Sequence, residues 1–207
     1  MRPLAIIEND VAMSAQIRSA VEAAGFQADN FPDGASALTN LSRRTFALAI
    51  LDLDLVDTDP FSVCREASRF VPVIALASKS SEELCLRAFE NGADDCVGRQ
   101  VPGRELVARI RNVLRRAEEQ DPESDTLLAA VSEMRVRGEG EPRDLTRGEA
   151  EVLALLLSRT PTPLTVSQMA EILRVKRGTL ESRIKTLRRK LGPEKLVSRG
   201  SLGYQLV

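Results

Sequence analysis

The 207-residue sequence predicts an α/β fold, a doubly wound parallel sheet of five strands, followed by a second, smaller domain. Apolar runs of strand length alternate with amphipathic segments over residues 3–117, which is typical of a parallel sheet covered by helices on both faces. Residues 1–126 carry 14 basic and 21 acidic residues, a net charge of −7, whereas residues 127–207 carry 15 and 9, a net charge of +6. This asymmetry indicates an acidic domain joined to one that binds nucleic acid.

The elements of the first domain follow from hydrophobic spacing and from residues that begin or end helices. Gly25 and Gly92 fit the residue that closes a helix, and Asp59 with Pro60 fits a helix start. The expected strands span residues 4–7, 27–31, 47–51, 71–76 and 95–97. The expected helices span residues 11–24, 34–42, 60 to about 70, 80–91 and 105–117.

An acidic stretch with one proline, residues 118–126, is typical of a linker between domains. We therefore expect domains over residues 1–117 and 127–207. In the second domain, residues 127–136 have strand-like character and a Gly-rich turn follows at 138–142. Thr146 and Glu149 have the spacing of a capping box. The expected helices there span residues 146–158, 165–173 and 179–191.

The third of these helices has one apolar stripe, and its other positions are largely cationic. Such a helix can pack on one side and lie beside phosphates in a DNA major groove on the other. The alternative is a basic solvated helix that binds nothing. The stripe consists of Leu180, Ile184, Leu187 and Leu191.

Composition excludes several classes of function. The chain has no histidine, which excludes histidine-based catalysis and argues against a zinc site, so we expect no metal and no cofactor. We find no nucleophile with a positioned base, so we do not expect an enzyme. The three cysteines do not have the spacing of a secreted disulfide framework. Without a signal-peptide pattern or a membrane-length apolar run, we expect a cytoplasmic protein with reduced thiols and no membrane partner.

Asp52 ends the apolar run from Phe46 to Leu51 and would therefore lie at the carboxyl end of a central strand. Open α/β sheets place their active sites at this edge. The segment Leu51-Asp52-Leu53-Asp54-Leu55, together with Glu8-Asn9 and Gly92-Ala93-Asp94-Asp95, resembles the receiver domain of OmpR/PhoB-type response regulators. The resemblance covers residues 1–117. It implies a flavodoxin/CheY-like sheet with strand order 2-1-3-4-5, an aspartate that accepts a phosphoryl group, and a bound Mg²⁺.

Several residues depart from the pattern of that family. Asn9 stands in place of one metal-binding carboxylate, and Ala77 in place of the hydroxyl residue that follows the phosphoryl group. Arg99 replaces the family's Lys, Gln100 the Pro after it, and Cys96 the aromatic side chain that changes rotamer. Together these changes remove the charged metal ligand, the hydroxyl and the aromatic switch, so we expect weak or no Mg²⁺ binding.

From these departures we predict that Asp52 does not work as a phosphoacceptor. Arg99 would instead form a permanent ion pair with Asp52 or Glu8. Two alternatives stay open: a conventional phosphorylated switch, in which Asp10 or Asp54 compensates for the lost carboxylate, and a receiver gated by a small ligand or a protein partner. The predicted pocket consists of Glu8, Asn9, Asp10, Asp52, Ala77 and Arg99.

The resemblance implies a homodimer through the fourth helix, the fifth strand and the fifth helix. Asp95 would pair with Arg109 across the dimer and Glu90 with Arg111, whereas the basic partner of Glu105 falls on Cys85. The alternative is that these are solvated charges of little energetic value. Oxidation of Cys85 and Cys96 could gate this pairing. Apolar contacts are expected from Leu84, Ala88 and Val107.

The basic domain resembles the winged helix-turn-helix domain of the same family. Residues 145–149 match its Leu-Thr-x-x-Glu helix start, residues 184–191 its recognition helix, and residues 198–206 its β-hairpin wing. Double-stranded DNA is therefore the expected partner. RNA polymerase would be a further partner through the loop before the recognition helix, but that loop is short here, so repression and activation through another surface stay open. The expected DNA contacts are Arg177, Thr179, Arg183, Lys185, Thr186, Arg188, Arg189, Lys190 and, in the wing, Arg199.

Overall fold

A computed structural model describes residues 2–78, 82–118 and 145–207 of the chain. The chain divides into two compact units, Met1–Glu118 and Glu119–Val207, and each has a hydrophobic core of its own. The strand predicted over residues 127–136 and the turn at 138–142 lie outside the described residues, as does most of the predicted linker. In the part of the chain that is described, no helix is both long and apolar enough to cross a bilayer.

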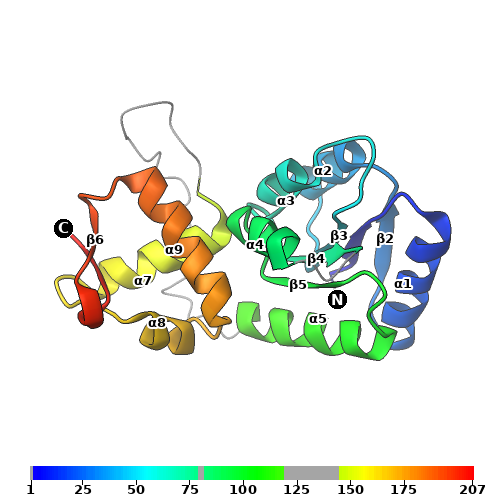
Figure 1. The fold of residues 1–207 in the computed structure, drawn as a ribbon. Helices are drawn as coiled ribbons and strands as arrows, with labels where there is room; N and C mark the ends of the chain where they lie inside the picture. Colours follow the sequence, from blue (N-terminus) through cyan, green and yellow to red (C-terminus); the bar gives the residue numbers. More distant parts are fainter. Residues whose placement is uncertain (1, 79–81, 119–144) are drawn as a thin grey trace. The chain divides into compact units, whose positions relative to one another are not determined.

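The first unit contains a parallel sheet of five strands, in the order β2-β1-β3-β4-β5, as predicted (Figure 1). Every residue of β1, β3 and β4 is buried, because helices cover both faces of these central strands. The strands are β1 (Leu4–Ile7), β2 (Ala28–Phe31), β3 (Leu48–Asp52), β4 (Val73–Ala77) and β5 (Asp95–Gly98).

Two helices pack on one face of this sheet and three on the other (Figure 1). Three of them begin at an aspartate whose carboxylate accepts backbone N–H groups of the first turn, at Asp10, Asp33 and Asp59. On one face lie α1 (Val11–Ala23) and α5 (Gly103–Glu118). On the other lie α2 (Gly34–Arg43), α3 (Pro60–Ala67) and α4 (Glu82–Glu90).

Two helix boundaries differ from the prediction for physical reasons. Helix α3 ends at Ala67 rather than near Phe70, because the chain turns into β4 and Pro72 cannot continue a helix. Helix α5 begins two residues early, at Gly103. A Cβ atom at Gly103 would lie 2.7 Å from the Cβ of Ala20, so the glycine permits the start of α5 to approach α1 closely.

The second unit packs α7 (Arg147–Arg159), α8 (Val166–Ile172) and α9 (Arg177–Leu191) around a separate core. The predicted capping box at Thr146 and Glu149 is present at the start of α7. A second capping box, formed by Thr165 and Gln168, begins α8. The predicted apolar stripe of α9 is buried in this core. Helix α9 begins at Arg177, two residues earlier than expected.

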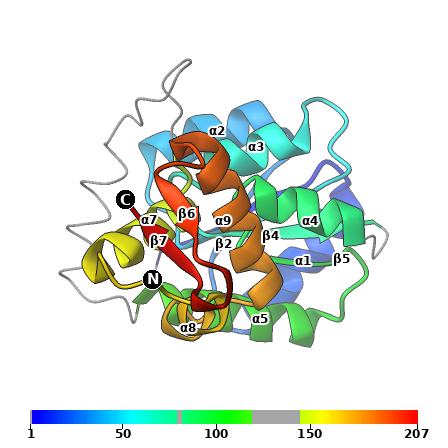
Figure 2. The same cartoon turned by 60° about the vertical axis from the view of Figure 1, so that its left-hand side comes forward.

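A β-hairpin completes the second unit (Figure 2). Strands β6 (Leu196–Ser198) and β7 (Tyr204–Leu206) are antiparallel, as expected for a wing. The backbone of Tyr204 exchanges two hydrogen bonds with that of Leu164, of 2.8 and 2.9 Å, which joins the hairpin to the segment before α8. Gly203 has φ +99° and lies so close to the Leu164 carbonyl that a Cβ atom would collide with it. The second unit therefore has the three helices and the hairpin of a winged helix-turn-helix.

Candidate functional site

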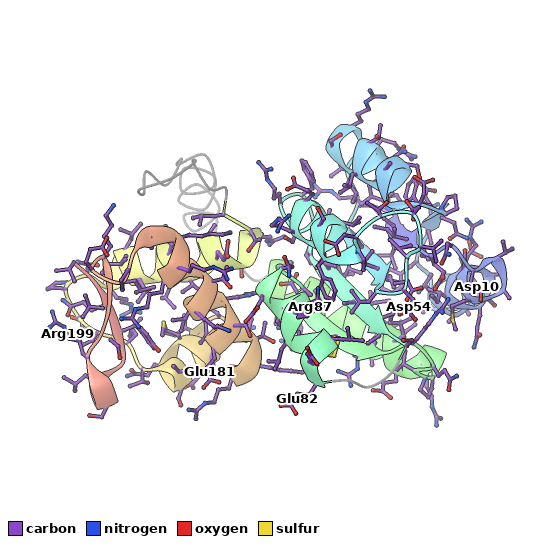
Figure 3. The ribbon with its side chains drawn as sticks, turned by 45° about the horizontal axis from the view of Figure 1, so that its top comes forward. Asp10, Asp54, Glu82, Arg87, Glu181 and Arg199 are labelled. Atoms are coloured by element: carbon purple, nitrogen blue, oxygen red, sulfur yellow. A yellow bond between two sulfur atoms is a disulfide. The ribbon has the colours of Figure 1, made fainter. Side chains whose placement is uncertain are left out.

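The carboxyl edge of the sheet gathers the acidic side chains that follow β1 and β3. Glu8 and Asp52 are almost inaccessible to solvent, with exposed fractions of 3% and 0%. Asp10 and Asp54 lie at the same edge and are more exposed (Figure 3). The backbone N–H of Asp54 donates to the Asp52 carboxylate at 3.2 Å. Parallel strands bring these carboxylates together because their carboxyl ends meet at one edge.

The guanidinium of Arg99, from the segment after β5, lies among these carboxylates. Its Nη2 atom is 2.8 Å from Glu8 and 3.5 Å from Asp52, so the predicted ion pair is present. Arg99 also approaches the two more exposed carboxylates, at 3.8 Å from Asp10 and 3.9 Å from Asp54. The Arg99 guanidinium thus lies within 3.9 Å of four carboxylates at the carboxyl edge of the sheet.

Asp52 is a strongly perturbed carboxyl group. Burial and the neighbouring charge of Glu8 raise its pKa from 3.8 to about 6, although the hydrogen bond from Asp54 and the charge of Arg99 both oppose this change. Its Oδ2 atom is buried and accepts no hydrogen bond from the described residues. Asp52 is therefore easier to protonate than an ordinary aspartate, even beside an arginine.

The residues that depart from the family pattern lie around the same pocket. Ala77 ends β4 with no exposed surface, and its carbonyl accepts a 2.7 Å hydrogen bond from the backbone N–H of Arg99. The next residue, Ser78, donates its hydroxyl to Asp54 at 3.2 Å. Asn9 is partly exposed and Gln100 is exposed. The only hydroxyl adjacent to Ala77 in sequence is thus directed to Asp54.

This donor set does not fit a bound Mg²⁺. The cation needs several oxygen ligands at about 2.1 Å in octahedral geometry, but the Arg99 guanidinium already contacts the Glu8 and Asp52 carboxylates. Asn9 offers an uncharged amide in place of a carboxylate. Among the residues with described positions, no cluster of three or more acidic or cysteine side chains is arranged to hold a metal ion.

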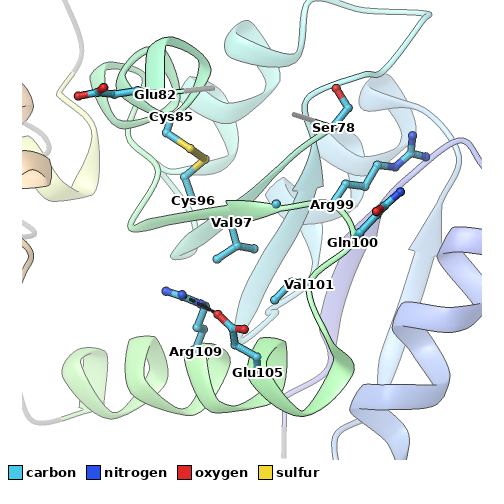
Figure 4. Close-up of a pocket in the computed structure, with 11 residues that line it drawn as sticks. Ser78, Glu82, Cys85, Cys96, Val97, Arg99, Gln100, Val101, Glu105 and Arg109 are labelled. Atoms are coloured by element: carbon cyan, nitrogen blue, oxygen red, sulfur yellow. Dashed lines mark hydrogen bonds and ion pairs between the residues drawn. A yellow bond between two sulfur atoms is a disulfide. The ribbon is translucent and has the colours of Figure 1, made fainter. Parts of the chain in front are cut away.

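Two of the residues predicted at the dimer face, Arg109 and Arg111, contact other residues of their own chain. Within one chain, Arg109 on α5 pairs with Asp95 at 3.0 Å and with Glu105 at 2.7 Å, and Figure 4 shows the second pair. Arg111 instead donates to the backbone carbonyl of Ala24, beyond the end of α1, and Glu90 is the last residue of α4. Of the apolar residues expected at this face, Ala88 and Val107 are buried in the core and Leu84 is partly buried, whereas the unpredicted Leu86 of α4 is 43% exposed.

Cys85 on α4 and Cys96 on β5 form a disulfide, with their Cα atoms 5.6 Å apart. The expectation of three reduced thiols is therefore wrong for this pair. Eleven positions separate the two cysteines in sequence, and only the docking of α4 on β5 brings them together. The third cysteine, Cys64, is a free thiol in the core.

The basic residues of α9 lie in two different environments. Arg177, Lys185 and Arg189 are exposed, and Arg188 is partly exposed. Arg177 pairs with Glu181 one turn further along the helix, at 2.8 Å. In the hairpin, Arg199 is exposed (Figure 3), and its guanidinium donates to Gln205. The exposed cationic surface of the second unit therefore includes one side of α9 and the hairpin.

The other predicted contact residues of α9 lie inward. Arg183 is only 1% exposed and pairs with Glu151 of α7 at 3.1 Å, and Gly148 makes room for its side chain. Lys190 pairs with Glu149 of α7. Thr179 and Thr186 are also buried. The two acidic partners on α7 could not be predicted from the sequence, because 32 and 41 positions separate the paired residues and no local pattern links them.

Comparison with known proteins agrees with this geometry. Residues 4–111 match the family model described as response regulator receiver domain. The chain is 32% identical over 228 aligned positions to the sensory transduction protein RegX3 of Mycolicibacterium smegmatis, covering all of this chain and 99% of the relative. It belongs to the OmpR/PhoB-type response regulators. RegX3 of Mycobacterium tuberculosis strain H37Rv is 31% identical, again with all of this response regulator aligned.

Solved structures show the same fold along the whole response regulator. A mutant of RitR aligns over all of this chain and 99% of its own, with a TM-score of 0.78 at 19% identity. DrrB of Thermotoga maritima, described as an OmpR/PhoB homolog, covers the same shares with a TM-score of 0.52 at 20% identity. Both matches extend through the second unit, so the two-part architecture is shared.

Proposed function

We propose that this response regulator is a cytoplasmic, DNA-binding transcriptional regulator whose receiver forms a homodimer without phosphorylation of Asp52. The position of Arg99 carries the proposal. Its guanidinium lies 2.8 Å from Glu8 and 3.5 Å from Asp52, where a phosphorylated receiver would need a metal ion and space for phosphoryl oxygens.

Among the residues that the structure describes, the pocket offers few groups that would stabilise a phosphorylated Asp52. A phosphoryl group adds about 1.5 to 2 negative charges at neutral pH, and these need a cation and hydrogen-bond donors. Arg99 already serves Glu8 and approaches Asp10 and Asp54, so it would have to leave these carboxylates to serve a phosphate. Ala77 offers no hydroxyl to a phosphoryl oxygen. We infer that the pocket keeps one conformation in place of a phosphate-driven switch.

The exposed charge of the second unit supports DNA binding. Lys185 and Arg189 lie on the exposed side of α9, and Arg199 lies on the hairpin, so the helix can contact a major groove while the hairpin contacts an adjacent minor groove. Arg188 adds a partly exposed cation on the same helix. The buried Arg183 and the paired Lys190 would act by holding α9 on α7.

Homodimerisation through α4, β5 and α5 would bring two such units onto paired half-sites. The exposed Leu86 supplies an apolar contact on α4. Asp95 and Arg109 pair within one chain. On dimerisation, each residue would either form this pair with the second chain or keep it within its own chain. The charged residues of this α4–β5–α5 face are therefore in place without phosphorylation of Asp52.

The test measures solution mass and affinity for operator-like DNA, with and without beryllofluoride and Mg²⁺. We expect a dimer in both conditions and DNA affinities that agree within about twofold. Arg99→Lys restores the family's residue, and Arg104→Lys is the matched control, since Arg104 is an exposed residue of α5. A monomer that dimerises and binds DNA only after treatment would overturn the proposal.

One observation favours a conventional phosphorylated switch as a second candidate. Asp10 and Asp54 both lie within 3.9 Å of the Arg99 guanidinium, so either carboxylate could replace the one lost at Asn9 if Arg99 moved away. Phosphoryl transfer from acetyl phosphate, detected by mass spectrometry, would then modify Asp52 in the unsubstituted chain. In that case Asp54→Asn would reduce the labelling.

A further inference from the structure

Cys85 and Cys96 differ from the third cysteine in their access to solvent. Cys85 and Cys96 are both partly exposed and line a surface pocket of about 550 Å³ (Figure 4). Cys64 has no exposed surface, and burial raises its pKa to about 12. Because the thiolate is the reactive form of cysteine, Cys64 is inert at neutral pH while the other two can meet a dissolved oxidant. The chain thus contains its own unreactive control.

The two reactive positions need no backbone movement to form a bond. Their Cα atoms are 5.6 Å apart, within the range of about 4.4 to 6.8 Å that disulfides adopt. The bond connects a helix to a strand, from α4 to β5 (Figure 4). In a cytoplasm that keeps most thiols reduced, a bond of this kind is usually transient and formed in response to oxidants.

The disulfide attaches a helix that buries few of its residues. Among the described residues of α4, Ala88 alone is fully buried, and Leu84 and Phe89 are only partly buried against the core. By contrast, α3 on the same face of the sheet buries four residues. Cys85 lies in the first half of α4, where Leu84 is only partly buried against the core, so the bond adds a covalent constraint there.

The other end of the bond lies beside the charged residues of the predicted dimer face. Cys96 directly follows Asp95, which pairs with Arg109, and Arg109 in turn pairs with Glu105. Glu105, Arg109 and both cysteines line the same pocket. The bond therefore joins α4 to the strand that carries the Asp95–Arg109 pair.

We propose that Cys85 and Cys96 are a site of reversible oxidation by a hydroperoxide, and that the disulfide locks α4 in the conformation that pairs with a second copy of this chain. One thiolate attacks the peroxide, its O–O bond breaks, and a sulfenic acid and an alcohol or water form. The second thiolate attacks the sulfenic sulfur and releases water. In total, two thiols and one hydroperoxide become one disulfide, one alcohol or water, and one further water. A low-molecular-weight thiol reverses the reaction by exchange.

The effect on pairing rests on the proposed homodimer. A mobile helix must lose conformational entropy when it enters an interface, and a cross-link removes part of that cost in advance. The exposed Leu86 and the terminal Glu90 belong to the helix that the bond constrains. Oxidation therefore strengthens the homodimer, and with it DNA binding, without any phosphate.

The first experiment treats the reduced full-length chain with hydrogen peroxide and follows intact mass, thiol labelling and amide hydrogen exchange. We expect a loss of about 2 Da, protection of Cys85 and Cys96 from labelling, and exchange in residues 82–90 slowed by about tenfold. Excess dithiothreitol should reverse all three. Cys64→Ser is the matched control for mass and thiol labelling and should lose about 2 Da as the parent chain does, whereas Cys85→Ser and Cys96→Ser should abolish the changes.

The second experiment measures the dimer dissociation constant of both redox forms by analytical ultracentrifugation. We expect the oxidised form to dimerise at least about fivefold more tightly, and Cys85→Ser to show no difference between conditions. Peroxide that leaves Cys85 and Cys96 as free thiols, or oxidises them without changing exchange in α4, overturns the inference. Formation of the bond with slowed exchange in α4 but no dimer in either state would retain the oxidation site and overturn the proposed homodimer alone.

Discussion

The pocket at the carboxyl edge of the sheet and the exposed side of α9 both contain clustered charged residues. The charges in the pocket are paired and largely buried, whereas those on α9 are exposed. In the pocket, the Arg99 guanidinium lies between the buried carboxylates of Glu8 and Asp52. On α9, Lys185 and Arg189 extend into solvent. Charge that is neutralised inside a domain holds one conformation, whereas charge presented to solvent is accessible to a partner.

The same distinction divides the arginines of α9 themselves. Arg183 is buried against Glu151, while Arg189 lies on the exposed side of the same helix. Two arginines six positions apart thus have different tasks, one structural and one available for binding. The following predictions test this distinction, beginning with the largest expected effect.

Replacing Arg183 with Ala should destabilise the second unit by about 3–5 kcal/mol, because Glu151 loses its buried cation and keeps only Arg147, and the large buried side chain of Arg183 leaves a cavity. Chemical unfolding followed by circular dichroism measures the change. Arg189→Ala on the same helix is the control and should alter stability by less than about 0.5 kcal/mol. Equal effects of the two substitutions would contradict the distinction between the buried and exposed arginines.

Replacing Arg99 with Ala should destabilise the first unit by about 2–4 kcal/mol at pH 7.5, since the cation between Glu8 and Asp52 is lost. The loss should shrink at pH 5, because Asp52, whose pKa is raised to about 6, is then largely protonated. Urea unfolding at pH 5 and 7.5 measures the two values. Arg104→Ala, in an exposed position of α5, is the control and should show no comparable loss.

Replacing Asp52 with Asn should stabilise the protein at neutral pH. The pKa of Asp52 is raised from 3.8 to about 6, so the stability that its protonated form contributes is present below pH 4 and lost as the pH rises through about 6. The amide in the Asp52→Asn variant stays uncharged and avoids this loss, which amounts to about 2–3 kcal/mol by pH 7.5. Urea unfolding at pH 4 and 7.5 should show no gain at the lower pH. A gain that is equal at both values would show that ionisation of Asp52 is not its cause.

Replacing Arg189 with Ala should weaken DNA binding by about tenfold without changing stability, because an exposed cation is removed from the side of α9 proposed to contact DNA. Fluorescence anisotropy measures the affinity for DNA, and repeating it at several salt concentrations distinguishes a phosphate contact from a base contact. Loss of a phosphate contact lowers the salt dependence by about one ion, whereas loss of a base contact relaxes specificity at one position. Glu181→Gln, an exposed position on the same helix, is the control and should not weaken binding.

Local sequence was sufficient to predict most of the fold. Among the described residues, the helices and strands of the first unit and the capping box at Thr146 agree with the structure to within a few residues. Each of these depends on interactions between residues close in sequence, or on hydrophobic periodicity. The strand order also agrees, but it was predicted from the resemblance to receiver domains. The strand boundaries shifted by one or two residues, as at β4, which begins at Val73 rather than Val71.

The candidate site was only partly predictable. The pair between Arg99 and Glu8, 91 positions apart, was predicted because the resemblance to receiver domains places both residues at one edge of a sheet. The pair between Arg183 and Glu151 was not, because the facing of α9 depends on how α7 and α9 pack. The disulfide depends in the same way on the docking of α4 against β5.

The sequence by itself determined the sheet, the two-part architecture, the family and the composition of the acidic pocket, since these depend on periodicity, on local signals and on which residue stands at each motif position. Tertiary structure decided which charges are neutralised and which are exposed. It placed one arginine of α9 inside and another outside, and it brought two cysteines of the same face within bonding distance. The reason is that burial and pairing depend on which surfaces pack together, and this packing joins residues that no local pattern connects.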